Sequence, residues 1–225
     1  TSFSMASQDV RYYLNGMLLE IQGDKLNGVA TDGHRLAFSS AKSGNSELDV
    51  RNILPRKAVL ELAKLLSPGE NEVNLLIGPS YVEVKTDNLS FSSKLIDGKY
   101  PDYDKVFPTG NPLPLEIDKE TLQAALSRAS VLSNEKYRGV RFQLSANKLK
   151  LTANNPEQES AEEELNVDYS GTDLEVGFNI GYLLDVLNSI EGNSVNFEFY
   201  GEDSSCIIKE KGSEDDVYVI MPMRL

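Results

Sequence analysis

Two parts of this sequence resemble each other at a nearly constant offset of about 123 residues. The stretch YYLNGMLLEIQGDKLNGVATD parallels KYRGVRFQLSANKLKLTANN, with Gly16 opposite Gly139. Further along, NEVNLLIG (71–78) parallels NSVNFEFY (193–200) at an offset of 122 residues. Solenoid repeats are much shorter, about 20–50 residues, so a repeat of this length indicates a duplicated domain. The fold must therefore place two similar domains in tandem.

A proline-rich stretch separates the two copies. The segment KVFPTGNPLPLEID (105–118) holds three prolines and one glycine without a clear periodicity, which is typical of a linker. A chain of 225 residues is long enough for two domains, each with its own core. We therefore predict one domain over 1–108 and a second over 109–225.

Apolar periodicity predicts strands with few helices between them. The run KLKLTA (148–153) alternates polar and apolar side chains, as a half-buried strand does. Apolar side chains at helical spacing predict a helix over 56–66 and two more around 122–129 and 183–190, with Asp118 as the N-cap of the second. This mixture predicts α+β domains built on antiparallel sheets.

The net charge of −13 is unevenly distributed. Residues 1–108 carry 12 Lys and Arg against 14 Asp and Glu, a net of −2, whereas 109–225 carry 10 against 21, a net of −11. Nucleic-acid binders usually present a basic surface, so binding of DNA by bulk electrostatics is disfavoured. A local basic face remains compatible with this composition.

The cysteine and histidine content and the hydropathy restrict the compartment, the metal sites and the membrane segments that this protein can have. The single cysteine, Cys206, cannot form an internal disulfide, which favours a reducing, cytoplasmic compartment. One histidine and one cysteine leave too few ligands for a zinc site of the His and thiolate type, and we expect no metal and no cofactor. No apolar run reaches the roughly 18 residues of a membrane span.

The only histidine lies in the stretch ATDGHRLA (30–37), beside an aspartate and an arginine. His34 could be a catalytic base paired with Asp32, the wall of a binding pocket, or an ordinary turn residue. The chain has no G-x-S-x-G elbow, P-loop or G-x-G-x-x-G motif, so catalysis is disfavoured. The acidic run PEQESAEEE (156–164) lacks the glycine turn of a calcium loop and predicts a solvated acidic turn.

The chain ends in the apolar, methionine-rich stretch YVIMPMRL. Chain termini are commonly polar and frayed. An apolar terminus therefore either packs into the core or lines an adaptable hydrophobic site.

Six stretches together resemble one known family: ATDGHRLA, YPDYDKVFP, LSNEKYRGVRF, ANNPEQESAEEE, FNIGYLLDVLN and MPMRL. They are similar to the beta sliding clamp of bacterial DNA polymerase III, and the similarity covers essentially all 225 residues in order. The resemblance implies tandem DNA-clamp domains, each a pseudo-duplicated βαβββ unit with antiparallel sheets outside and helices on one face. In that family three such domains form a chain, and two chains close head to tail into a ring around duplex DNA. By this resemblance 1–108 is an N-terminally truncated middle domain, and 109–225 is the C-terminal domain.

The resemblance also implies a function. The family members are processivity factors without catalytic activity, which tether polymerase and repair proteins to DNA through a hydrophobic pocket for short linear motifs. The implied partners are duplex DNA, bound without sequence specificity, the DNA polymerase III alpha subunit, the clamp loader and other clamp-motif proteins. The full-length protein is expected to be a homodimer, whereas this fragment is expected to be monomeric. The alternative is an acidic peptide-binding scaffold without a DNA role.

Site residues follow from the same resemblance, position by position. The partner-peptide pocket is expected to comprise Leu14, Thr31, Gly33, His34, Arg35, Leu36, Pro101, Lys105, Val106, Tyr137, Asn179, Tyr182, Ser205, Val219, Ile220, Met221, Pro222, Met223, Arg224 and Leu225. Lys105 and Tyr137 stand where the family often has arginine and phenylalanine. The DNA-contacting residues are expected to be Gln8, Tyr12, Tyr13, Arg56, Lys57 and Lys64.

Overall fold

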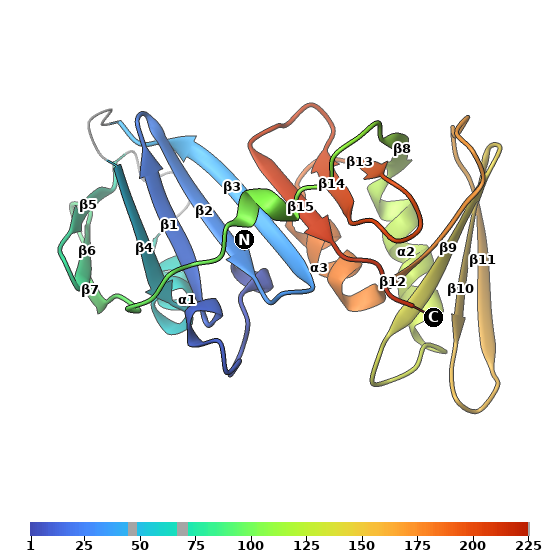
Figure 1. Ribbon diagram of the computed structural model, residues 1–225, viewed down its shortest axis with the longest axis horizontal. Helices are drawn as coiled ribbons and strands as arrows, with labels where there is room; N and C mark the ends of the chain where they lie inside the picture. The colour runs from blue at the N-terminus through green and yellow to red at the C-terminus, as the bar shows by residue number, and fades with distance from the viewer. Residues whose placement is uncertain (45–48, 67–71, 225) are drawn as a thin grey trace. The chain divides into compact units, whose positions relative to one another are not determined.

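The computed structural model describes residues 1–44, 49–66 and 72–224, and the chain divides into two compact units. The first unit is Thr1–Asp102 and the second is Tyr103–Leu225 (Figure 1). Both contain antiparallel sheets and helices, so the α+β class predicted from the sequence is confirmed. The division falls six residues before the boundary expected from the sequence.

The second unit contains the βαβββ motif twice. The first copy comprises β8 (Leu113–Asp118), α2 (Lys119–Ser130), β9 (Gly139–Ser145), β10 (Lys148–Asn154) and β11 (Ser160–Asn166). The second copy comprises β12 (Leu174–Asn179), α3 (Ile180–Ser189), β13 (Ser194–Phe199), β14 (Cys206–Glu210) and β15 (Asp216–Ile220). The copies exchange their first strands, because β12 pairs with β9 and β8 pairs with β13. The resulting sheets have the orders β11-β10-β9-β12 and β8-β13-β14-β15.

The first unit begins with two short 3-10 helices, η1 (Ser2–Ser4) and η2 (Tyr12–Leu14). Its main sheet has the order β4-β1-β2-β3 and is built from β1 (Gly16–Gln22), β2 (Lys25–Thr31), β3 (Arg35–Lys42) and β4 (Asp49–Pro55). Helix α1 (Arg56–Leu65) follows, and then the sheet of β5 (Asn74–Ile77), β6 (Tyr81–Lys85) and β7 (Ser90–Lys94). In the second unit a further 3-10 helix, η3 (Tyr103–Val106), precedes β8.

Local sequence signals account for the helices. The helix predicted over 56–66 is α1, which ends one residue earlier, at Leu65. The predicted cap of α2 is present, because the Asp118 carboxylate accepts a hydrogen bond from the Thr121 N–H at 2.8 Å. Asn179 caps α3 in the same way through the Tyr182 N–H at 3.2 Å.

Two predictions about irregular segments are wrong. The second half of the predicted linker forms β8, in which Leu115 and Ile117 are buried while Pro114 and Glu116 face solvent. The prolines obscured this period-2 pattern. The predicted acidic turn is also mostly a strand, because Ser160–Asn166 is β11. Its glutamates form ion pairs with Lys150 at 2.9 Å, Arg128 at 2.7 Å and Lys148 at 3.5 Å.

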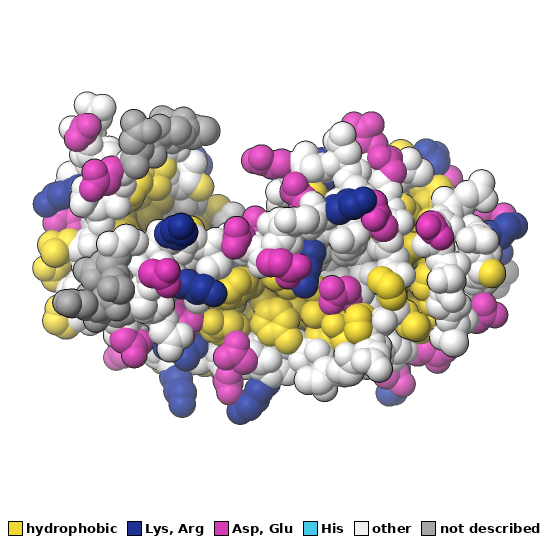
Figure 2. Space-filling model, turned by 90° about the horizontal axis from the view of Figure 1, so that it is seen from above, with side chains coloured by type: hydrophobic (Ala, Val, Ile, Leu, Met, Phe, Trp, Pro, Cys, Tyr) yellow, Lys and Arg dark blue, Asp and Glu magenta, His cyan; other side chains and the backbone are white. Residues whose placement is uncertain are grey.

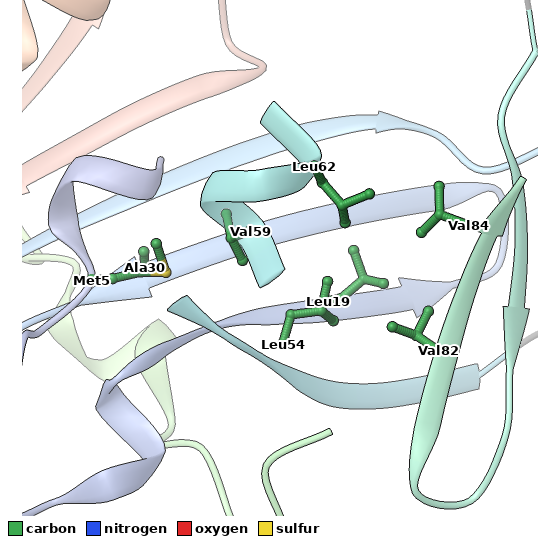
Figure 3. Packing of buried hydrophobic residues seen from close by; sticks show 8 residues of the cluster. All are labelled: Met5, Leu19, Ala30, Leu54, Val59, Leu62, Val82 and Val84. Atoms are coloured by element: carbon green, nitrogen blue, oxygen red, sulfur yellow. The ribbon is translucent and has the colours of Figure 1, made fainter. Parts of the chain in front are cut away.

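The core of the first unit lies between α1 and the two sheets. Leu19 and Leu54 from the main sheet meet Val59 and Leu62 from α1, and Val82 and Val84 from β6 complete the cluster with Met5 and Ala30 (Figure 3). All eight side chains are buried. This packing holds the main sheet, which carries the turn between β2 and β3.

The core of the second unit contains a cluster of phenylalanines. Phe142 on β9 and Phe178 on β12 meet edge to face, with ring centroids 5.4 Å apart. Phe197 and Phe199 on β13 stack at 5.8 Å, and each lies 6.3 Å from one of the first two rings. The cluster therefore joins the two sheets of this unit.

Surface charge follows the composition. Basic and acidic side chains are interspersed on the face shown in Figure 2.

Within the described ranges, no group of three His, Cys, Asp or Glu side chains could hold a metal ion. None of the helices found there has the length and apolar character needed to cross a membrane.

Candidate functional site

The turn between β2 and β3 carries His34 at an exposed position. One carboxylate oxygen of Asp32 accepts hydrogen bonds from the backbone N–H groups of His34 at 2.9 Å and Arg35 at 3.1 Å. The Thr31 hydroxyl accepts from the Gly33 N–H at 3.0 Å. Gly33 has φ +92°, a backbone conformation that favours glycine. Asp32 therefore shapes the turn, because one carboxylate oxygen accepts from the turn backbone and the other accepts from the Arg35 guanidinium.

Arg35 holds the start of the chain against this turn. Its Nε lies 3.0 Å from the Asp32 carboxylate, and a terminal nitrogen donates to the Phe3 carbonyl at 2.7 Å. The guanidinium also lies over the Phe3 ring, 5.5 Å from its centroid. Only 11% of the Arg35 side chain is exposed, so its contacts in this structure are mainly internal.

The loop before η2 is attached to the same turn. The Arg11 guanidinium donates to both carboxylate oxygens of Asp9, at 3.0 and 2.8 Å, and to the Asp32 carbonyl at 3.2 Å. Hydrogen bonding from Arg11 lowers the pKa of Asp9 to about 2. The Asn15 side chain donates to the Asp9 carbonyl at 2.8 Å and accepts from the Asp9 N–H at 2.9 Å. These bonds make the loop and the turn one connected structure.

In the second unit, the end of the chain runs beside the edge strand β12. The Met223 N–H donates to the Gly177 carbonyl at 2.8 Å, and the two residues form an isolated antiparallel bridge. Val219 and Ile220 on β15 are completely buried, whereas Met221, Pro222 and Met223 are half-buried. The tail therefore leaves the core at residue 221 and presents apolar side chains at the surface.

A cavity of about 330 Å³ opens beside this tail. Its described lining consists of Asn134, Tyr137, Gly139, Arg141, Thr152, Asn154, Met223 and Arg224. It combines a ring, a thioether, hydroxyl and amide groups, and two guanidinium groups. Such a mixture suits a peptide ligand, which has both apolar side chains and polar main-chain groups.

Asn179 joins the loop on one side of this cavity to α3. Besides capping the helix, its side-chain amide donates to the Tyr137 carbonyl at 3.2 Å. The Asn134 side chain accepts from the N–H groups of Lys136 and Tyr137, both at 2.9 Å. The loop is thus fixed from both sides, and it holds the Tyr137 side chain 55% exposed.

Each of the two units matches its own family model. A family model described as "DNA polymerase III beta subunit, central domain" matches residues 1–102, and the one described as "DNA polymerase III beta subunit, C-terminal domain" matches residues 104–224. The chain belongs to the DNA polymerase III beta subunit family. The resemblance and the tandem clamp domains inferred from the sequence are confirmed.

Several beta subunits are similar to this chain over its whole length. The beta sliding clamp of Pseudomonas putida is 50% identical over 226 residues, and that of Escherichia coli K12 is 49% identical over 225 residues. A crystal structure of the DNA polymerase III subunit beta from Pseudomonas aeruginosa is 51% identical with a TM-score of 0.96 and covers all of this chain. A second Pseudomonas aeruginosa structure, at TM-score 0.97, is of a sliding clamp bound to griselimycin. The chain spans 62% of the length of the curated relatives and of the first of these crystal structures, and 61% of the second.

The residues expected to bind partner peptides in this beta-subunit chain differ in exposure. Leu14, Leu36, Val219 and Ile220 are buried and underlie the surface. Thr31 is buried as well. Exposed or half-buried positions are Gly33, His34, Arg35, Pro101, Lys105, Val106, Tyr137, Asn179, Tyr182, Ser205, Met221, Pro222, Met223 and Arg224. Leu225 lies outside the described residues. Within the second unit, the structure brings Tyr137, Met223 and Arg224 together around one cavity.

The residues expected to contact DNA also differ from one another. Gln8 and Tyr12 are exposed, and the Tyr12 and Tyr13 rings meet edge to face at 5.8 Å. On α1, Arg56 donates to the Met5 carbonyl at 3.0 Å, and Lys64 forms an ion pair with Glu61 at 3.0 Å. Lys57 is exposed. The helix face is thus of mixed charge, and the exposed cations on it are Lys57 and Lys64.

Sequence reasoning missed five residues that line the cavity: Asn134, Gly139, Arg141, Thr152 and Asn154. The period-2 pattern of β9 and β10 places Gly139, Arg141, Thr152 and Asn154 on the outer faces of their strands. That pattern is readable from the sequence. The position of the tail beside these strands is not.

Proposed function

We propose that this chain forms the central and C-terminal parts of a cytoplasmic sliding clamp that tethers polymerase and repair proteins to duplex DNA. The clamp carries out no catalysis of its own. The proposal is supported by the two domain matches and by relatives named beta sliding clamp that are about half identical over the whole chain. The function of those relatives is therefore the simplest one for this sequence.

We further propose that partners bind through short linear motifs. The observation that carries this proposal is the open cavity beside the half-buried tail, where Tyr137 and Met223 offer apolar surface and Asn179 fixes the adjoining loop. The residues of the His34 turn, in the first unit, are also expected from the sequence resemblance to contact partner peptides. A related clamp from Pseudomonas aeruginosa binds griselimycin, which supports a ligand site on proteins of this kind. The expected partners are the polymerase III alpha subunit, the clamp loader and other proteins with a clamp motif.

DNA contact in this proposal is independent of sequence. Gln8, Tyr12, Tyr13 and the exposed lysines of α1 offer contacts to the phosphate backbone, while the net charge of −13 keeps those contacts weak. Weak phosphate contacts suit a clamp that slides, because retention then comes from encirclement and not from affinity.

A peptide containing glutamine followed by leucine and phenylalanine is expected to bind saturably in the micromolar range. Fluorescence polarisation of the labelled peptide measures this directly, and a scrambled peptide of the same composition is the control. His34→Ala should weaken binding only modestly, because the exposed imidazole is one part of the pocket wall. No saturable binding at high micromolar concentration would refute the partner-site proposal.

The 225-residue chain is expected to sediment as a monomer of 24.9 kDa. In a head-to-tail ring each seam joins two different domains, and the matched domains account for only the central and C-terminal ones. Without encirclement, duplex DNA should bind with a Kd of roughly 10⁻⁴ M or weaker at physiological salt. Sedimentation velocity over a range of concentrations tests this prediction. A constant mass of twice the chain would show an interface that the proposal lacks.

A further inference from the structure

We propose that the cavity beside the tail is a subsite for a carboxylate-bearing residue that flanks the partner motif. This inference rests on the proposed peptide-binding function and adds a determinant of selectivity to it. The ligand is an Asp or Glu side chain of the partner peptide. The cavity lies on the outer face of β9 and β10, beside the apolar part of the proposed peptide-binding site.

The lining of the cavity comes from different parts of the unit. Arg141 on β9 and Thr152 on β10 are paired in register and line the cavity together with Gly139 and Asn154. Asn134 and Tyr137 from the loop before β9, and Met223 and Arg224 from the tail, complete the described lining. A volume of about 330 Å³ is at the lower end of the range for ligand sites, which suits one or two side chains.

The charge of the lining differs from that of the surrounding domain. Residues 109–225 carry a net charge of −11, yet two of the eight described lining residues are arginines and none is Asp or Glu. A carboxylate placed there meets Arg141 and Arg224, whereas most other surfaces of this domain would repel it. The cavity is therefore a local site for an anion in an acidic domain.

Arg141 is already paired, but in a form that a ligand can replace. Its guanidinium forms an ion pair with Glu175, and the two side chains are 36% and 46% exposed. Glu175 also accepts a hydrogen bond from the Gln143 amide at 2.9 Å. Solvent-exposed pairs contribute little to stability, so a ligand carboxylate can share Arg141 or displace Glu175 at small cost. Glu175 keeps Gln143 as a partner after such an exchange.

The Tyr137 ring and Met223 provide apolar surface for the aliphatic part of the ligand side chain. Tyr137 is 55% exposed as a residue, and the Lys136 ammonium lies over its ring, 5.1 Å from the ring centroid. This third cation adds to the positive potential around Tyr137. The geometry thus favours a carboxylate on a short apolar stem over a neutral amide of the same shape.

The test compares five labelled peptides: the core motif alone, and the motif with either two glutamates or two glutamines added at its N-terminus or at its C-terminus. We expect the glutamate extension at one end to bind about fivefold more tightly than the matching glutamine extension at low salt, which is the scale of an exposed charge pair. The ratio should fall toward one as ionic strength rises. Extensions are added at both ends because the experiment also determines which end of the bound motif faces the cavity.

Two variants with the same change in charge assign the effect to a residue. In Arg141→Gln the ratio of the affinities for the glutamate and glutamine extensions should fall to about one. Both peptides are measured on the same variant, so any change in affinity for the core motif cancels in this ratio. Lys150→Gln is the matched control. Lys150 is also on the outer face of this sheet, is 34% exposed and forms an ion pair with Glu162 at 2.9 Å, but it does not line the cavity. In that variant the preference should be retained.

The outcomes separate the inference from the proposed function. Binding of the core motif without any preference for glutamate at either end would overturn the inference alone. Equal loss of the preference in both variants would also overturn it, because the effect would then be one of net charge. No binding of any of the peptides would overturn the proposed function and this inference with it.

Discussion

Removal of residues 221–225 is expected to weaken partner-peptide binding by well over tenfold while both units stay folded. Met221, Pro222 and Met223 are half-buried, so part of each side chain is open to a ligand. Covering an apolar side chain of this size completely contributes about 1.5–3 kcal/mol, and losing part of several such contacts exceeds a tenfold effect. The fold should survive, because the fully buried Val219 and Ile220 remain in β15.

Thermal denaturation and fluorescence polarisation on the same samples test this prediction. A shorter truncation that ends at residue 223 is the control, because it keeps the Met223 bridge to Gly177 and removes only Arg224 and Leu225. It should keep most of the affinity for the core motif. Unfolding of the longer truncation would show that the tail belongs to the core, as one of the two interpretations of the sequence held.

Much of the fold was predictable because its signals are local. The spacing of Leu122, Ala125 and Leu126 and the cap at Asp118 define α2 without reference to the rest of the chain. The offset between the two copies predicted the tandem domains. Strand β8 was missed because Pro112 and Pro114 dominate its local composition, although its apolar residues alternate. Proline is tolerated there since β8 is an edge strand of its sheet, with β13 as its neighbouring strand.

The candidate site was less predictable because its geometry depends on distant residues. The residues around His34 left three roles open, of which the family resemblance favoured the pocket wall. The bonds of Asp32 to the backbone of the turn likewise disfavour the catalytic role. The cavity in the second unit needs the register of β9 with β10 and the bridge of Met223 to Gly177. That bridge joins residues 46 positions apart, and nothing in either local sequence indicates it.

Phe142→Ala is expected to lower the free energy of unfolding of the second unit by about 3–5 kcal/mol. Phe142 has no exposed surface and contacts Phe178 on its own sheet and Phe197 on the other. Truncation would leave a cavity between the sheets, where neighbouring strands restrict collapse. Since typical domains are stable by only about 5–15 kcal/mol, such a loss would bring the unit close to unfolding.

Urea denaturation followed by circular dichroism measures this loss, and Tyr137→Ala is the control. Tyr137 is 55% exposed, so its truncation should change the free energy of unfolding by no more than about 0.5 kcal/mol.

The same two variants should affect peptide binding in the opposite order. Phe142 and Arg141 are adjacent on β9, with Phe142 in the core and Arg141 at the cavity. Phe142→Ala should therefore bind peptide nearly normally at temperatures where it is folded, whereas Tyr137→Ala should bind weakly at all temperatures. A loss of stability below about 1 kcal/mol for Phe142→Ala would contradict the role given to the phenylalanine cluster.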